Sequence, residues 1–277
     1  MPDFWRAYDA GREAPDRAAA LIQAFFEPHA ELYAGAGLKP TAARVGKWLA
    51  GFDPLAADVR RLTARFPALY AGHVRHFAAA LPDFRPDQAP IYLMPSLFAF
   101  DGHLQPWRDR VPLFVGLDGV VRYHGAGADL SVFLDHEAFH LYQAQANPDL
   151  SLDPAPPIYA SVWIEGAATY VSSRLNPGAA LLHVLLDDAP LAQAGPGVIR
   201  TGARDLLERL DSTADADQLR FLSAGYAGPS PARLGYRLGF EIARRAARSL
   251  SLAEMARVGR KPLRDLMQRQ LEVLATA

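Results

Sequence analysis

The sequence contains no cysteine in 277 residues. Disulfide bonds, iron–sulfur clusters and thiol catalysis are therefore excluded, because each of them needs a cysteine sulfur. A metal ion can still be bound, but only through nitrogen and oxygen ligands. A functional site that depends on a metal must therefore be built from histidine and carboxylate side chains.

The chain also lacks an excess of charge of either sign, since 29 Lys and Arg stand against 30 Asp and Glu. Neither a nucleic acid nor an acidic membrane surface is therefore expected as a partner. No apolar run approaches the ~20 residues that a membrane-spanning helix needs. The first residues, MPDFW, show neither the basic start nor the apolar core of a signal peptide. We expect a cytoplasmic protein, or a periplasmic or secreted one if a signal peptide was removed.

The length suits one large domain or two small domains with a full hydrophobic core. Half of the residues are hydrophobic (50%) and 21% are charged, which is ordinary for a globular protein. Helical periodicity dominates both ends of the chain, whereas short strand-like runs occur in the middle. We expect a mostly helical α+β fold in one compact unit, with a helical region at 1–88, a small sheet and a functional helix at 89–150, and a helical subdomain at 151–277.

Three short apolar runs predict the small sheet. Residues 91–94 are bounded by prolines and are typical of a strand. Residues 111–117 and 120–123 predict two further strands, because the Asp118-Gly119 pair between them is a strong signal for a two-residue hairpin turn. Residues 96–110 are rich in aromatic and polar side chains and are predicted to form a loop.

Residues 135–140 read DHEAFH and contain the helix-borne zinc pattern H-E-x-x-H. Each residue of an α-helix turns by about 100°, so His136 and His140 lie one turn apart and can bind one metal ion. Glu137 lies about 60° round from His140, where its carboxylate can reach a water on that metal. The alternative is a core helix with two internally bonded histidines, but burying these polar groups without partners is costly.

A catalytic zinc ion takes three protein ligands and leaves one position for water, so the motif predicts a third ligand elsewhere. Glu165 is the single acidic residue in the apolar and small-residue run 158–172. A lone carboxylate on such a face needs a cation, a hydrogen-bond cluster or a metal. Glu165 is therefore the candidate third ligand, and the alternative is a charge near the N-terminus of a helix.

Together, H-E-x-x-H at 136–140 and W-x-E-G-x-A at 163–168 resemble the gluzincin metallopeptidases, which bind zinc through two His and one Glu. The second piece is similar to the E-G-x-A segment of the zinc aminopeptidases. The wider run, as far as G-Y-R-L-G at 235–239, resembles a group of uncharacterised bacterial predicted zinc-dependent proteases. The resemblance implies a zincin-like fold in which a small sheet precedes the H-E-x-x-H helix, one Zn²⁺ ion, and a peptide or protein substrate.

Two features depart from the related families. Thr169 stands where thermolysin-like enzymes have an Asp that orients a ligand His. The Glu motif with which the aminopeptidases bind a substrate amine is missing, so aminopeptidase specificity is not implied.

The three ligands imply a hydrolytic mechanism. Zinc on His136, His140 and Glu165 would lower the pKa of a bound water towards ~7. Glu137 would accept the proton of that water as it attacks a carbonyl group, and would pass it to the leaving nitrogen. The resemblance further implies that a Tyr or His from the C-terminal half stabilises the oxyanion.

Two tyrosines and two arginines are candidates for the rest of the site. Tyr236 is the preferred oxyanion donor, because glycines on either side allow its helix to pack closely. Tyr226 is the second candidate for this role and is also a candidate for binding the substrate. Arg233 and Arg237 are candidates for binding a substrate carboxylate.

Two other classes of protein fit the same ligands. Two His and one carboxylate also form the facial triad of iron(II) oxygenases, although such an enzyme leaves Glu137 without a task. A non-catalytic binding protein could use the metal as a structural element, but structural zinc sites normally have a fourth protein ligand.

Overall fold

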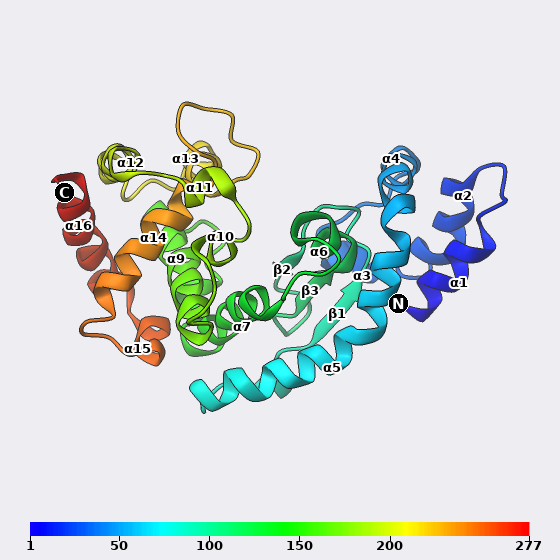
Figure 1. Cartoon of the computed structure of the whole chain (residues 1–277), viewed down its shortest axis with the longest axis horizontal. Coiled ribbons are helices and arrows are strands. Elements are labelled where there is room, and N and C mark those ends of the chain that lie inside the picture. Colours follow the sequence, from blue (N-terminus) through cyan, green and yellow to red (C-terminus); the bar gives the residue numbers. More distant parts are fainter. Residues whose placement is uncertain (277) are drawn as a thin grey trace. The chain divides into compact units, whose positions relative to one another are not determined.

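The computed structural model describes residues 1–276, which form two compact units. Unit 1 comprises Met1–Val74 and Pro86–Ala128, and unit 2 comprises Arg75–Arg85 and the residues from Asp129 onward. Helices dominate both units and the described residues form one three-stranded sheet, which confirms the mostly helical α+β class (Figure 1). The boundary after Ala128 falls inside the segment 89–150, so the sheet and the H-E-x-x-H helix belong to different units.

Unit 1 begins with a series of helices, drawn in blue to cyan in Figure 1. They are α1 (Pro2–Ala10), α2 (Arg17–Leu21), the π-helical turn η1 (Ile22–Phe26), α3 (Ala30–Gly35), α4 (Ala42–Phe52), the 3-10 turn η2 (Asp53–Leu55) and α5 (Ala56–Ala80), whose residues from Arg75 onward belong to unit 2. The Thr41 hydroxyl caps α4 by accepting a hydrogen bond from the Arg44 amide. Aromatic rings fill the core between these helices, and the Trp48 and Phe52 ring centroids lie 4.4 Å apart.

The sheet of unit 1 follows the 3-10 turn η3 (Pro86–Gln88) and has the strand order β1-β3-β2. Its strands are β1 (Ile91–Met94), β2 (Gly102–Leu104) and β3 (Leu113–Gly116). β1 runs parallel to β3 with Ile91 opposite Leu113, and β2 runs antiparallel to β3 with Gly102 opposite Val115. The central strand β3 is buried along its whole length, as expected for a strand with neighbours on both sides.

The segment after β3 forms a helix, α6 (Leu117–His124), and the hairpin predicted at Asp118-Gly119 is therefore wrong. The glycine serves close packing instead of a turn, because a Cβ atom on Gly119 would lie 2.0 Å from the Phe100 carbonyl oxygen. The strand predicted at 120–123 is the second half of this helix. The third strand is instead β2, which lies in a segment predicted as a loop.

Asp118 is fully buried and accepts hydrogen bonds from the Trp48 side chain at 2.8 Å and from the Ser96 and Phe98 amides at 2.6 and 2.9 Å. Burial raises the pKa of the Asp118 carboxyl group, and these donors oppose the rise. The same bonds hold a loop in which Leu97 and Phe98 have φ angles of 57° and 55°. Non-glycine residues seldom adopt this left-handed conformation, so Asp118 stabilises a strained loop between β1 and β2.

From Asp129 onward, unit 2 consists of helices, drawn in green to red in Figure 1. They are α7 (Ser131–Ala146), α8 (Pro148–Ser151), α9 (Ile158–Leu175), α10 (Leu181–Val184), α11 (Ala189–Ala192), α12 (Pro196–Glu208), α13 (Asp215–Leu222), α14 (Leu234–Ala246), α15 (Leu252–Arg257) and α16 (Arg260–Thr276). The segment 75–85 joins this unit through Asp83, whose carboxylate accepts a hydrogen bond from the Tyr142 hydroxyl at 2.8 Å and pairs with Arg257. Among residues 1–276, no helix combines the length and the apolar character needed to cross a membrane.

The N-terminus of α9 is capped by backbone carbonyl groups, since no side chain caps it. The Ile158 amide donates to the Ser212 carbonyl at 2.8 Å, and the Tyr159 amide donates to the Leu210 carbonyl at 3.2 Å. Free N–H groups at a helix start need such partners. The loop between α12 and α13 therefore fixes the start of α9.

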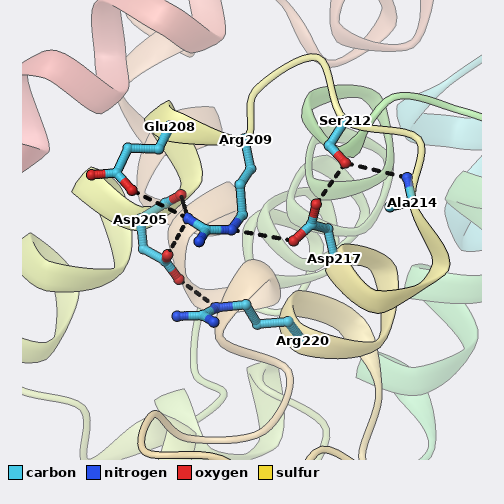
Figure 2. A network of polar contacts seen from close by, with 7 residues as sticks. All are labelled: Asp205, Glu208, Arg209, Ser212, Ala214, Asp217 and Arg220. Carbon is cyan, nitrogen blue, oxygen red and sulfur yellow. Dashed lines mark hydrogen bonds and ion pairs between the residues drawn. The ribbon is translucent and has the colours of Figure 1, made fainter.

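A polar network stabilises this capping loop (Figure 2). The Arg209 guanidinium bridges Asp205 on α12 and Asp217 on α13, the latter at 3.3 Å. Asp217 also accepts a hydrogen bond from the Ser212 hydroxyl at 2.5 Å, and Arg220 pairs with Asp205. The network fixes the loop from both flanking helices and thereby holds its carbonyl groups at the end of α9.

Helices α9 and α14 pack through two glycines. A Cβ atom on Gly166 would lie 2.2 Å from the Cα atom of Gly239, and one on Gly239 would lie 2.3 Å from the Val162 carbonyl oxygen. Both distances are far below a normal contact, so neither position accepts a larger residue without moving a helix backbone. Gly239 is one of the two glycines beside Tyr236 for which the sequence predicted close helix packing.

We expect Gly166→Ala to lower the free energy of unfolding by about 2–3 kcal/mol, because overpacking forces α9 and α14 apart. Gly197→Ala is the matched control, since Gly197 is also helical but has open space around its Cβ position. The control should leave the stability unchanged or raise it slightly, as alanine favours helix. Denaturant unfolding measures both variants, and equal midpoints for Gly166→Ala and wild type would contradict the packing argument.

Candidate metal centre

Helix α7 buries its polar motif residues among apolar ones. Asp135, His136 and Glu137 are 0%, 2% and 7% exposed. The helix begins at Ser131, whose amide donates a hydrogen bond to the Asp129 carboxylate at 2.9 Å. Burial of three adjacent ionisable side chains on one helix is costly unless they meet charged or polar partners.

The structure brings His136, His140 and Glu165 together as a group that could hold a metal ion. The two Nε2 atoms lie 3.0 Å apart, and each lies 3.3 Å from Oε2 of Glu165. Ligand atoms of a tetrahedral ion with ~2.0 Å bonds stand about 3.3 Å apart, so the triangle has the size that zinc requires. The placement of Glu165 on α9, beside both imidazoles, agrees with the prediction that it is the third ligand.

The charges of the group are coupled. Burial by itself would lower the pKa of His140, but the Glu165 carboxylate beside it raises that pKa to about 9. Burial likewise acts to raise the pKa of Glu165, whereas the two histidines lower it to well below its usual range. A metal ion that binds Nε2 of His140 would therefore compete with a proton.

A second link joins α7 to α9 at the far end of α9. The Asn176 side-chain amide donates to the Asp135 carboxylate at 2.7 Å and to the Ser172 carbonyl at 2.9 Å. Burial raises the pKa of Asp135 to about 6. The contact holds the helix that carries both histidines against the helix that carries Glu165.

Two polar residues show how the ligands are supported. The Thr169 hydroxyl donates to the Glu165 backbone carbonyl at 2.8 Å, so this side chain bonds within its own helix. His140 instead finds a partner in Gln143, whose Oε1 lies 3.2 Å from Nδ1 of the imidazole. The sequence interpretation missed Gln143, although a polar residue one turn after a ligand His is the signal that could have indicated it.

Tyr236 lies beside the group on the first turn of α14. Its ring is nearly parallel to that of His136, with an interplanar angle of 10° and centroids 6.2 Å apart. Burial raises the pKa of Tyr236 well above its usual value, and the negative charge of Glu165 adds to the rise. The phenol therefore keeps its proton at neutral pH and can donate a hydrogen bond at the metal group.

Both candidate arginines have carboxylate partners within the protein. Arg233 donates to Asp188 through Nε at 3.2 Å and through Nη2 at 2.9 Å, and its guanidinium carbon lies 5.8 Å from the centre of the Tyr236 ring. Arg237 pairs with Glu241 at 3.0 Å. Of the two guanidinium groups, that of Arg233 is therefore the one that lies over the Tyr236 ring.

Tyr226 lies in the loop between α13 and α14. Its ring covers Gly228, because a Cβ atom on that glycine would lie 1.9 Å from the Tyr226 hydroxyl oxygen. The Tyr226 amide donates a hydrogen bond to the Ser223 carbonyl at 3.3 Å, within the same loop. Of the two candidate tyrosines, Tyr236 is the one whose ring contacts that of His136.

No protein-family model matches the chain, and no curated protein or solved structure is significantly similar to it. The resemblance to the gluzincins therefore rests on the motif residues. A functional proposal has to be argued from the geometry of the metal group and the side chains around it.

Proposed function

We propose that the protein is a zinc-dependent metallopeptidase that hydrolyses peptide or similar amide bonds. The observation that carries the proposal is the triangle of His136, His140 and Glu165 ligand atoms, 3.0 to 3.3 Å on each side. Two imidazole nitrogens and one carboxylate oxygen are a donor set of catalytic zinc sites, which keep the fourth position for water. When bound, zinc would supply a Lewis acid that lowers the pKa of that water towards ~7.

The residues around the triangle would perform the proton transfers. Glu137 follows His136 directly on α7 and lies outside the group of three ligands. Its carboxylate would accept a proton from the attacking water and give it to the leaving nitrogen. Tyr236 would donate its hydroxyl proton in a hydrogen bond to the oxyanion that forms on the substrate carbonyl.

Glu137 also favours hydrolysis over the two alternatives. An iron(II) oxygenase can use the same two His and one carboxylate, but it needs no general base next to the first His. A structural metal site has no use for such a base either, and it normally has a fourth protein ligand. Among the described residues, the group contains three ligands and no fourth.

The proposal is tested by elemental analysis of protein purified without added metal, together with cleavage of a mixed peptide library. We expect one zinc per chain, peptide cleavage, loss of cleavage after treatment with a chelator, and recovery on adding zinc. Iron in place of zinc would favour the oxygenase. A zinc-loaded chain that cleaves no peptide would contradict the peptidase proposal.

A further inference from the structure

The two ring nitrogens of His140 face different partners. Nε2 lies in the metal group, 3.3 Å from the Glu165 carboxylate, whereas Nδ1 lies 3.2 Å from Oε1 of Gln143. Gln143 is 2% exposed, so its side-chain amide is held inside unit 2 and is shielded from water. A buried amide at this position must satisfy its hydrogen bonds within the protein, and the imidazole is one of its partners.

The orientation of this amide selects one form of the histidine. A nitrogen that binds a metal needs a free lone pair, so a His that binds through Nε2 carries its proton on Nδ1. The carbonyl oxygen of an amide accepts that proton, whereas its NH₂ group would favour the opposite form. Gln143 presents its oxygen to Nδ1 and thereby favours the form of His140 whose Nε2 can bind.

We propose that Gln143 is a positioning residue that fixes the ring orientation and the protonated nitrogen of His140 for metal binding. The proposal rests on the metal site of the proposed function and does not depend on peptide hydrolysis. Partners of this kind are carboxylates, backbone carbonyls or waters in many metal sites, and losing one typically costs 10–100-fold in metal affinity. Thr169 does not take this part, because its hydroxyl bonds to the backbone of its own helix.

Because the Gln143 side chain is uncharged, it orients His140 without adding negative charge to the metal group. A carboxylate in its place would add a negative charge next to a group that already contains Glu165, with Glu137 on the same helix. Extra negative charge makes the imidazole a stronger ligand and the bound ion a weaker Lewis acid. A neutral amide instead orients His140 and leaves the ion more electrophilic.

The test compares zinc affinity in Gln143→Leu and Gln145→Leu, measured by competition with a chromophoric chelator. Leucine has a similar volume but accepts no hydrogen bond, so Gln143→Leu should weaken zinc binding about 10–100-fold. Gln145 is the matched control on the same helix, because its amide bonds to the Arg85 backbone at 3.1 and 2.8 Å. Gln145→Leu should keep the wild-type affinity.

Gln143→Glu separates the acceptor from packing. This variant keeps an acceptor oxygen opposite Nδ1, so it should bind zinc at least as tightly as the wild type while Gln143→Leu binds more weakly. Wild-type affinity in Gln143→Leu, or an equal loss in the Leu and Glu variants, would overturn the proposal. A wild-type chain without zinc affinity would overturn the metal site as well, whereas one that binds zinc and cleaves nothing would overturn only the proposed function.

Discussion

Glu137→Gln should retain full zinc content and lose peptide hydrolysis by a factor of about 10²–10⁴, the usual contribution of a general base. The amide has the shape of the carboxylate but cannot accept the proton of the attacking water. Zinc should remain because the three ligand atoms come from His136, His140 and Glu165. The measurement is zinc content and turnover of a peptide library on the same preparations.

The control for this variant is Glu272→Gln, which makes the same chemical change on the exposed face of α16. It should match the wild type in zinc content and in turnover. A Glu137→Gln protein that cleaves peptides as fast as the wild type would show that another group acts as the base. Loss of zinc from Glu137→Gln would instead show that Glu137 is a ligand.

His140→Ala should abolish stoichiometric zinc binding, and with it all hydrolysis. The substitution removes one corner of the ligand triangle and leaves Glu165 with a single imidazole partner, His136, at 3.3 Å. Catalytic zinc sites use three protein ligands, and this variant retains only two of them. Elemental analysis after dialysis against zinc-free buffer measures the effect.

His183→Ala serves as the control, because His183 pairs with Asp187 at 2.6 Å and takes no part in the metal group. It should keep one zinc per chain, and full zinc content in His140→Ala would refute the assignment of the site.

Zinc binding to the wild type should also depend on pH. Protons compete with zinc for His140, because the Glu165 carboxylate raises the pKa of this histidine to about 9. The apparent zinc affinity should fall about tenfold for each pH unit below that value.

The ligand group could be predicted from the sequence because its geometry is mostly local. An α-helix places His136 and His140 one turn apart whatever surrounds it, and Glu165 was recognisable as a lone acid in an apolar run. The mostly helical α+β class followed from periodicity in the same way. These inferences needed no knowledge of contacts between distant parts of the chain.

The prediction of a hairpin at Asp118-Gly119 was wrong because contacts with residues distant in the sequence determine the conformation of that segment. Asp118 bonds to Trp48, which lies 70 residues earlier, and Gly119 is needed for close approach to Phe100. A two-residue turn signal carries no information about either contact. The pairing of Arg233 with Asp188 across 45 residues was hidden for the same reason.

Unit 2 is built from two separate stretches of chain, which sets the order in which it can fold on the ribosome. Its first stretch, 75–85, is synthesised before the second stretch of unit 1, yet Asp83 pairs with Tyr142 and with Arg257, which come 59 and 174 residues later. Domains generally fold as units during synthesis, N-terminal ones first. Unit 1 can therefore fold once residue 128 has emerged from the ribosome. Residues 75–85 cannot pack in unit 2 until α7 and α15 have been synthesised. The candidate metal ligands all lie in the late stretch, so a nascent chain gains this group only after the whole of unit 1 has been synthesised.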